Sequence, residues 1–159
     1  MMTSKPAGQL RSVLPLLILA VFSVSAPLLR AQEARQCQIV VQEILAENTG
    51  QGLDDALKSL KKDLDKLNYS TYRLSNTYEL KVAFSESGNL TLLGDNKLIL
   101  TAEGLDENGK IRLKVKLSPR DSKSKALDMV LRIPDGGTFL IGGPNYSQGV
   151  LILAFTAKL

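Results

Sequence analysis

Apolar and polar residues alternate over most of the second half of the chain. Residues 111–117 give the clearest case, because Ile111, Leu113, Val115 and Leu117 are separated by basic residues. This period of two is typical of strands with one buried and one solvated face. The same alternation predicts further strands at residues 78–84, 98–102 and 127–133, and residues 138–141 predict another short strand. Residues 150–155 are apolar on both faces and predict a central strand.

One strand and one helix are predicted ahead of this region. Residues 36–47 are rich in β-branched side chains and predict a strand. Residues 53–67 carry leucines at spacings of four and three, which predict an amphipathic helix that covers one face of a sheet. The polar side of this helix predicts ion pairs between residues four apart, namely Asp54–Lys58 and Lys61–Asp65.

Short segments rich in Gly, Asn, Asp and Pro separate the predicted strands. Asn108-Gly109 strongly favours a two-residue hairpin turn, and 86–89 and 94–96 are also turn-like. Further turns, with glycines at positive φ, are expected at Pro134, Asp135, Gly136, Gly137, Gly142 and Gly143. The fold class is therefore mainly β with one helix (α+β). We expect an antiparallel β-sandwich or a rolled meander sheet, covered by the amphipathic helix.

The net charge of +4 belongs mostly to the N-terminal segment. Lys5, Arg11 and Arg30 precede Gln32, and 17 basic and 16 acidic residues follow from there. A basic start, an apolar run and small residues before Gln32 are typical of a secretory signal peptide at residues 1–31, which leaves residues 32–159 as one β-rich domain. The alternative is an uncleaved membrane anchor, since residues 12–29 are uncharged. Either alternative predicts export to the periplasm or beyond, and membrane contact is expected only if the segment is uncleaved.

The composition excludes several kinds of chemistry. The chain has no histidine, which removes Ser-His-Asp and Cys-His catalysis, and its single cysteine, Cys37, cannot form an internal disulfide or a multi-thiolate metal site. We expect Cys37 to pack as a small strand residue, the alternative being an intermolecular bridge. The sequence contains neither the P-loop motif G-x-x-x-x-G-K-[ST] nor the dinucleotide-binding motif G-x-G-x-x-G. We therefore expect no enzyme activity, cofactor or metal, and we expect solvated charges rather than catalysis from the carboxylate pairs Asp54/Asp55, Asp63/Asp65 and Asp106/Glu107.

A basic stripe is the candidate interaction surface in the sequence. Arg112, Lys114 and Lys116 share one face of a predicted strand, and Lys110 precedes them. Such a stripe attracts anionic lipid, polysaccharide or nucleic acid. Export argues against nucleic acid as a partner. The alternative is a solvated strand face whose lysines discourage edge pairing.

One C-terminal segment resembles a known family. Ile133-Pro-Asp-Gly-Gly-Thr-Phe-Leu-Ile-Gly-Gly143 resembles a hairpin of the bacterial outer-membrane secretins, in which a V-P-D-G-type turn is followed by a strand ending in I-G-G. Residues 108–117 and 150–156 are similar to the neighbouring secretin strands. The segment that closes the secretin pattern after the two glycines is missing here. The resemblance implies a similar β-hairpin, in an exported bacterial accessory protein rather than in a pore.

These observations predict an exported bacterial envelope protein. Its expected role is that of a non-enzymatic interaction or assembly module with a protein partner in the cell envelope, linked to secretion. The alternative is a periplasmic carrier of a small apolar or anionic ligand, with a cavity behind strands 111–117 and 150–155. The loops at residues 48–52, 119–125 and 142–148 are the first places to look for a binding surface.

Overall fold

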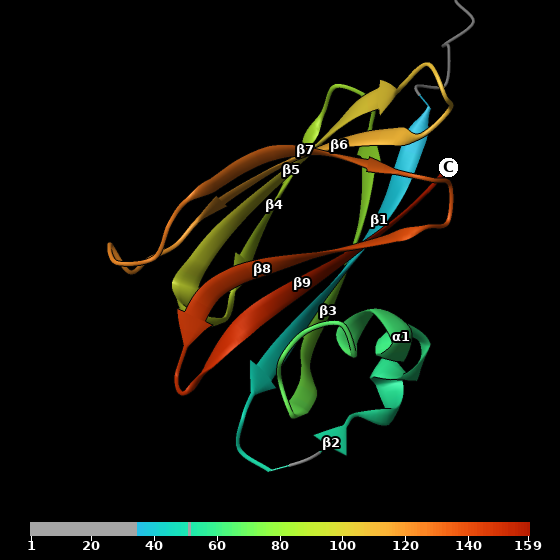
Figure 1. The fold of residues 1–159 in the computed structure, drawn as a ribbon. Helices are drawn as coiled ribbons and strands as arrows, with labels where there is room; N and C mark the ends of the chain where they lie inside the picture. Colours follow the sequence, from blue (N-terminus) through green and yellow to red (C-terminus); the bar gives the residue numbers. More distant parts are fainter. Residues whose placement is uncertain (1–34, 51) are drawn as a thin grey trace, which may run out of the picture. The chain divides into compact units, whose positions relative to one another are not determined.

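The alternating segments form two β-sheets that pack face to face in a computed structural model, which describes residues 35–50 and 52–159 (Figure 1). The five-stranded sheet has the order β2-β3-β1-β9-β8, and the four-stranded sheet is the meander β4-β5-β6-β7. The strands of the five-stranded sheet are β1 (Gln36–Glu47), β2 (Gly52–Leu53), β3 (Thr71–Ala83), β8 (Thr138–Tyr146) and β9 (Gly149–Lys158). The strands of the four-stranded sheet are β4 (Ser87–Leu92), β5 (Asn96–Leu105), β6 (Ile111–Ser118) and β7 (Leu127–Ile133). The mainly β fold class and the sandwich-like packing are confirmed.

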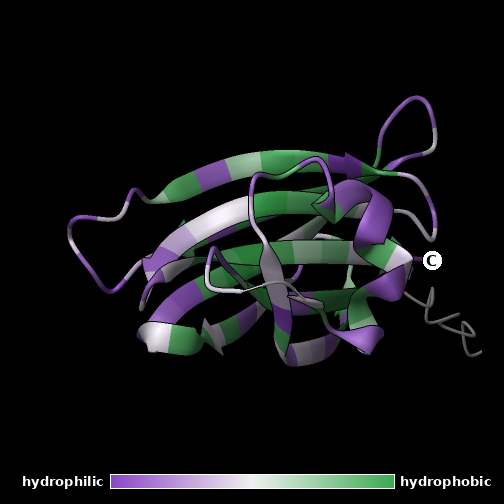
Figure 2. Ribbon diagram, turned by 60° about the horizontal axis from the view of Figure 1, so that its bottom comes forward, coloured by the Kyte–Doolittle hydropathy of each residue, from purple (hydrophilic) through white to green (hydrophobic). Residues whose placement is uncertain are grey.

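The inner faces of the two sheets share one hydrophobic core. The alternate residues of β6 that the period of two selects, Ile111, Leu113, Val115 and Leu117, are all at most 1% exposed. They meet apolar side chains from the opposite sheet, among them Phe155 of β9. Apolar residues concentrate along the strands, whereas the connecting loops are largely hydrophilic (Figure 2).

A second core lies on the outer face of the five-stranded sheet, beneath the helical segment. Leu57, Leu60 and Leu64 from that segment pack against strand residues including Ile44 and Ile152. The Tyr72 hydroxyl donates hydrogen bonds to the carbonyls of Leu64 (2.8 Å) and Leu67 (3.1 Å). Burial raises the pKa of this phenol. The expectation that a leucine-striped segment covers a sheet face is therefore confirmed.

The prediction of one continuous helix over residues 53–67 is wrong. The segment consists of β2, a 3₁₀ helix at Asp55–Leu60 and one α-helical turn, α1, at Lys61–Leu64. The β2–β3 pairing holds Leu53 extended, and the Asp54 carboxylate accepts a hydrogen bond from the Leu74 N–H at 2.8 Å. Asp54 is thereby held against β3 rather than in a helical turn. A 3₁₀ helix brings residues three apart into line, which suits the spacing of Leu57 and Leu60.

The ion pairs on this segment differ in part from those predicted. Lys58 pairs with Asp55 at 2.8 Å, not with Asp54, because Asp54 is held by β3. Lys61 pairs with Asp65 at 2.6 Å as predicted. These exposed pairs contribute about 0–1 kcal/mol each, so the leucines, not the charges, hold the segment in place.

Two predicted turns are positioned differently in the structure. The turn expected at residues 86–89 is mostly strand, since β4 begins at Ser87. Residues 134–137 do form a turn, but β7 and β8 belong to different sheets, so this turn carries the chain across the sandwich instead of closing a hairpin. Apolar residues alternate in the same way whether the two strands form a hairpin or belong to different sheets. The sequence therefore does not distinguish these two arrangements.

The glycines of this region have different roles from those expected. Gly136 has a φ of 71° and needs the freedom of glycine, whereas Gly137 is required because a Cβ there would lie 2.9 Å from the Pro134 carbonyl oxygen. Gly142 and Gly143 lie inside β8, where the β8–β9 register shifts between Gly142 and Asn145. The prediction of a turn at these two glycines is wrong, since neither has a positive φ. The small size of Gly143 instead suits the irregular strand, because a Cβ there would lie 3.0 Å from the Leu151 carbonyl oxygen.

The described residues, 35–50 and 52–159, belong to one compact unit. The predicted signal peptide or anchor at residues 1–31 lies outside the described residues. No helix within the described part is long and apolar enough to cross a membrane.

Candidate functional site

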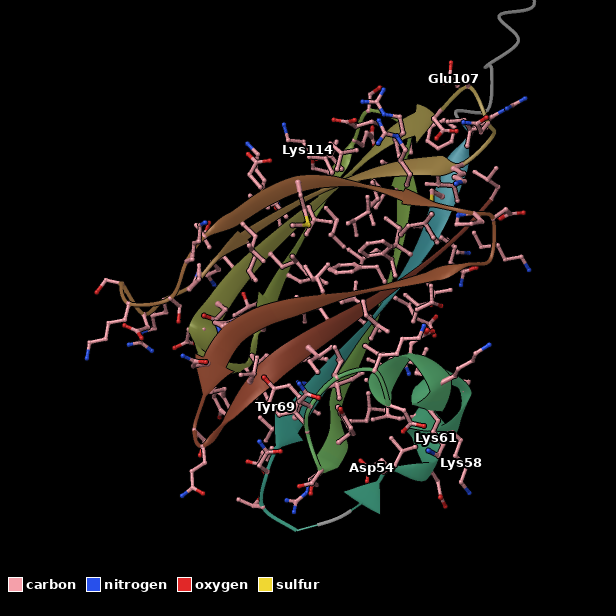
Figure 3. All side chains as sticks on the ribbon, viewed as in Figure 1. Asp54, Lys58, Lys61, Tyr69, Glu107 and Lys114 are labelled. Carbon is pink, nitrogen blue, oxygen red and sulfur yellow. The ribbon has the colours of Figure 1, made fainter. Side chains whose placement is uncertain are left out.

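The predicted basic stripe lies on the outer face of the four-stranded sheet. Arg112, Lys114 and Lys116 alternate with buried residues along β6, and Lys110 is exposed in the turn before it. Lys114 points away from the core, on the side of the molecule opposite the helical segment (Figure 3). The structure therefore brings the four residues to one face, as the period of two predicts.

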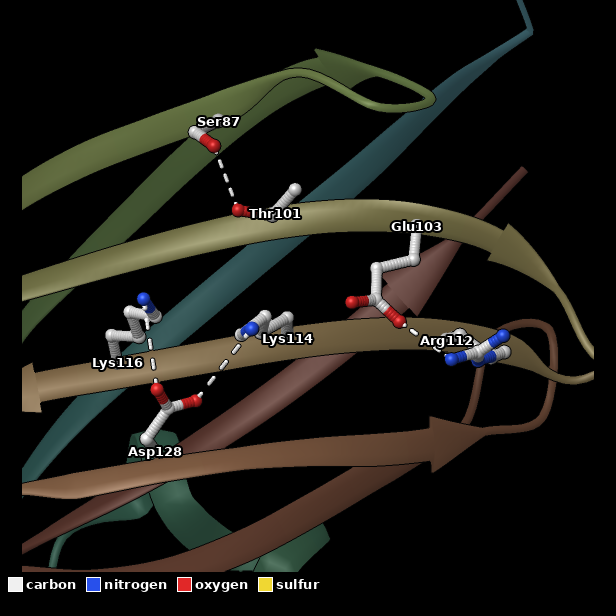
Figure 4. Close-up of polar contacts among 7 residues, drawn as sticks. All are labelled: Ser87, Thr101, Glu103, Arg112, Lys114, Lys116 and Asp128. Atoms are coloured by element: carbon white, nitrogen blue, oxygen red, sulfur yellow. Dashed lines mark hydrogen bonds and ion pairs between the residues drawn. The ribbon is translucent and has the colours of Figure 1, made fainter.

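Neighbouring carboxylates balance most of this stripe. The Asp128 carboxylate lies between two lysines, 3.6 Å from Lys116 Nζ and 4.0 Å from Lys114 Nζ (Figure 4). Arg112 donates to Glu103 at 2.8 Å. The stripe is thus a cross-strand ladder of solvated ion pairs, and it offers a weaker field to an anionic ligand than the sequence suggests.

A wide hollow of about 570 Å³ lies where the stripe meets the β5–β6 turn. Its wall mixes both signs of charge, because Asp106 and Glu107 face Lys110, Arg112 and Arg132 there. The backbone N–H groups of Lys110 and Asn108 donate to Asp106 at 2.9 Å and hold the pKa of its carboxyl below the usual range. Asp106 therefore stabilises the β5–β6 turn, and the hollow beside it is a consequence of the shape of this turn.

The three carboxylate pairs, each adjacent or nearly adjacent in the sequence, do not converge on a common site. Asp55, Asp63 and Asp65 each pair with a nearby lysine on the helical segment. Asp54 of that segment and Glu107 of the β5–β6 turn lie at opposite ends of the structure (Figure 3). A carboxylate-only hydrolase needs two such groups across one cleft. These three pairs do not provide that geometry.

Two of the three loops selected from the sequence meet at one end of the sandwich. The segment after β6 and the irregular end of β8 line two adjoining hollows of about 280 and 220 Å³, which share Ser124, Pro144 and Asn145. We call these two hollows the loop groove. Its remaining lining is mostly polar or basic: Gly94, Asn96, Arg120, Asp121, Lys123, Lys125, Leu127, Gly142, Gly143 and Tyr146.

Local hydrogen bonds hold the walls of the loop groove. Asn96 is 4% exposed, and its side-chain oxygen accepts from the Arg120 N–H at 3.0 Å while its amide donates to the Leu93 carbonyl. The Arg120 guanidinium pairs with Asp95. The Asp121 carboxylate accepts from the Lys123 N–H at 3.0 Å, which turns the loop back on itself. The groove is therefore a built feature of the fold rather than a gap between unrelated loops.

A fully buried glutamate contacts the β4–β5 connection, whose Gly94 lines the loop groove. Glu43 of β1 faces the inner core and accepts hydrogen bonds from Leu93 N–H (2.8 Å), Asn76 Nδ2 (3.0 Å) and the Tyr78 hydroxyl (3.3 Å). Burial, together with the neighbouring carboxylate, raises the pKa of Tyr78. Leu93 belongs to the β4–β5 connection, so this carboxyl ties the two sheets together. Glu43 is not among the residues predicted from the sequence, although it alternates in phase with the buried Val41.

An apolar pocket of about 170 Å³ lies on the other side of the five-stranded sheet. Leu67 and Tyr69 form one wall, and Leu140 and Ile152 lie against them. Pockets for drug-sized ligands hold about 300–1,000 Å³, so this one has room only for a smaller apolar group. Between strands 111–117 and 150–155, where the carrier hypothesis places its cavity, the inward side chains of both sheets belong to one packed cluster.

Cys37 lies in the inner core with 0% exposure. Burial raises the pKa of its thiol, which disfavours the reactive thiolate. The expectation of a quietly packed strand residue agrees with this position, whereas an intermolecular bridge would require Cys37 to leave the core.

Within residues 35–50 and 52–159 no group of three or more Cys, Asp or Glu side chains has the arrangement of a metal site. The features that remain as candidates for recognition are the loop groove, the ion-paired stripe and the open edge of β8. Comparisons with protein-family models, with curated proteins and with solved structures find no match.

Proposed function

We propose that this protein is an exported bacterial envelope protein that acts as a non-enzymatic interaction or assembly module, linked to secretion, and that the loop groove binds its protein partner. The convergence of the loops around residues 119–125 and 142–146 in one groove is the observation that carries the proposal. Loops on a rigid sandwich are a common position for recognition.

The chemistry of the groove favours an acidic polypeptide segment. Lys123 and Lys125 line the groove, and none of the ion pairs among the described residues involves either of them. Arg120, by contrast, is engaged with Asp95. The stripe on β6 is also ion-paired, which makes the groove the better candidate surface.

Site-specific photo-crosslinking in the native envelope tests the proposal. A photoreactive residue at Ser124 or Asn145 is expected to capture the same protein, identified by mass spectrometry, and one at the exposed Asn89 of β4 is not. The charge reversals Lys123→Glu and Lys125→Glu are expected to abolish capture, whereas Lys114→Glu on the stripe is not. Capture that is equal from all three positions and insensitive to these reversals would contradict the proposal.

The carrier alternative rests on the small apolar pocket beside Leu140. Its distinguishing result is an apolar compound that is extracted from the purified native protein and is lost in Leu140→Gln. An extract without such a compound, together with a groove-dependent protein partner, would favour the interaction module.

A further inference from the structure

The β8 strand is an open edge of the five-stranded sheet. Within residues 35–50 and 52–159, β9 is the only strand that pairs with it. Its nine residues, Thr138–Tyr146, include no charged side chain, and Phe139 is 44% exposed. An uncharged edge with an exposed aromatic residue is a template for strand addition.

The backbone direction along β8 follows from its first bonds to β9. The Ala157 N–H donates to the Gly137 carbonyl, and the Ala157 carbonyl accepts from the Gly136 N–H. Because N–H and C=O groups alternate in direction along a strand, those of Phe139 and Ile141 face β9. Those of Thr138, Leu140 and Gly142 therefore point to the open side.

This pattern is complementary to itself. In an antiparallel pairing of two β8 strands around Leu140, Thr138 faces Gly142 of the second copy and Leu140 faces Leu140. All three positions present outward N–H and C=O groups, so the hydrogen-bonded pairs of an antiparallel ladder fall into register. On the inner side of the sheet Phe139 is placed opposite Ile141 of the second copy, an aromatic and β-branched pair that stabilises sheets. The register shift after Gly142 sets the end of the pairing.

The other edges are less suited to such pairing, and β2, at the far edge of the same sheet, has only two residues. β7 carries Asp128 and Arg132 on its solvent face. The carbonyl of Thr91 in β4 already accepts a hydrogen bond from the Tyr78 hydroxyl at 3.2 Å. Charged side chains and occupied backbone groups both discourage strand addition.

We propose that two copies of this chain associate through β8, antiparallel about a two-fold axis at Leu140, so that their five-stranded sheets become one continuous sheet. Such an interface is isologous and closes as a dimer. The inference does not rest on the proposed function, because it concerns the oligomeric state and not the capture of an envelope partner.

Analytical ultracentrifugation tests the dimer by measuring the association state of the protein, purified in the form that its host produces. The wild type is expected to show a reversible monomer–dimer equilibrium. Gly142→Pro removes an outward N–H on each copy and is expected to weaken the dimer at least about tenfold. Gly142→Ala keeps the N–H, and because its Cβ meets nothing within 4 Å, we expect its dimer constant within about twofold of the wild type.

Amide hydrogen exchange locates the interface in the same samples. The amides of Thr138, Leu140 and Gly142 are expected to become protected as the protein concentration rises through the dimer constant, while far-UV dichroism shows that Gly142→Pro keeps its fold. A wild type that remains monomeric up to about 1 mM overturns the proposal. A dimer in which these three amides exchange freely, or which the folded Gly142→Pro variant retains at full strength, also overturns it.

Discussion

Removal of the Glu43 carboxyl is expected to loosen the attachment between the two sheets. In Glu43→Ala the Leu93 N–H loses its buried acceptor, which costs about 1–3 kcal/mol. The lost Cγ methylene adds about 0.8 kcal/mol. Asn76 is exposed and regains water, and Tyr78 keeps the Thr91 carbonyl, so neither adds much. We expect Glu43→Ala to lower the free energy of unfolding by about 2–4 kcal/mol, a large part of the typical 5–15 kcal/mol.

Urea denaturation and amide exchange measure this effect. Glu43→Gln keeps the methylenes and an acceptor for Leu93, so we expect a loss of at most about 1 kcal/mol. Glu79→Ala removes an exposed glutamate from β3 and is expected to change stability by no more than about 0.5 kcal/mol. The Leu93 amide is expected to exchange slowly in the wild type and in Glu43→Gln, and faster in Glu43→Ala. A Glu43→Ala protein within about 1 kcal/mol of the wild type, with unchanged exchange at Leu93, would refute the reasoning.

Three further predictions concern single side chains. Tyr72→Phe leaves the carbonyls of Leu64 and Leu67 without this donor and is expected to cost about 1–2 kcal/mol in urea denaturation; an unchanged midpoint would contradict the role given to this hydroxyl. The Cys37 thiol is buried and its pKa is raised, so we expect slow reaction with a thiol reagent in native protein and fast reaction in denaturant; equal rates would argue against its burial. The Asp106 carboxyl has a lowered pKa in the fold, so its stabilisation is present above the ordinary carboxyl pKa and is lost as the pH falls; the stability difference between the wild type and Asp106→Asn should shrink toward acid, and a pH-independent difference would contradict it.

Most strands of this fold are predictable from the sequence because burial on one face imposes a period of two. The alternation around Leu131 and Ile133 places β7 at residues 127–133, as the structure has it. The strand β4 is not predicted, because it begins with Ser-Gly-Asn, which has the composition of a turn. The helix prediction fails for a tertiary reason, since the bond from the Leu74 N–H to Asp54 outweighs a leucine pattern that an α-helix and a 3₁₀ helix both satisfy.

The candidate sites also combine features that the sequence predicts with features that depend on the tertiary structure. The loops at residues 119–125 and 142–148 are recognisable as loops or irregular segments from their composition, but their meeting depends on β8 and β6 lying in different sheets. The balance of the stripe by Asp128 requires the β6–β7 register, which the sequence leaves open. The burial of Glu43, by contrast, is predictable from the sequence, because the strand phase that buries Val41 also points Glu43 inward.

The position of β1 between β3 and β9 sets an order for folding. The meander β4-β5-β6-β7 is local in sequence, and each of its strands finds a partner as soon as the next one is made. β1 obtains its second neighbour only when the last strand, Gly149–Lys158, is available. During synthesis, which starts at the N-terminus, the four-stranded sheet is therefore complete while the edge of β1 that later pairs with β9 is still unpaired. For that interval β1 is the segment most open to misassembly, and the ten residues of β9 govern how soon the hazard ends.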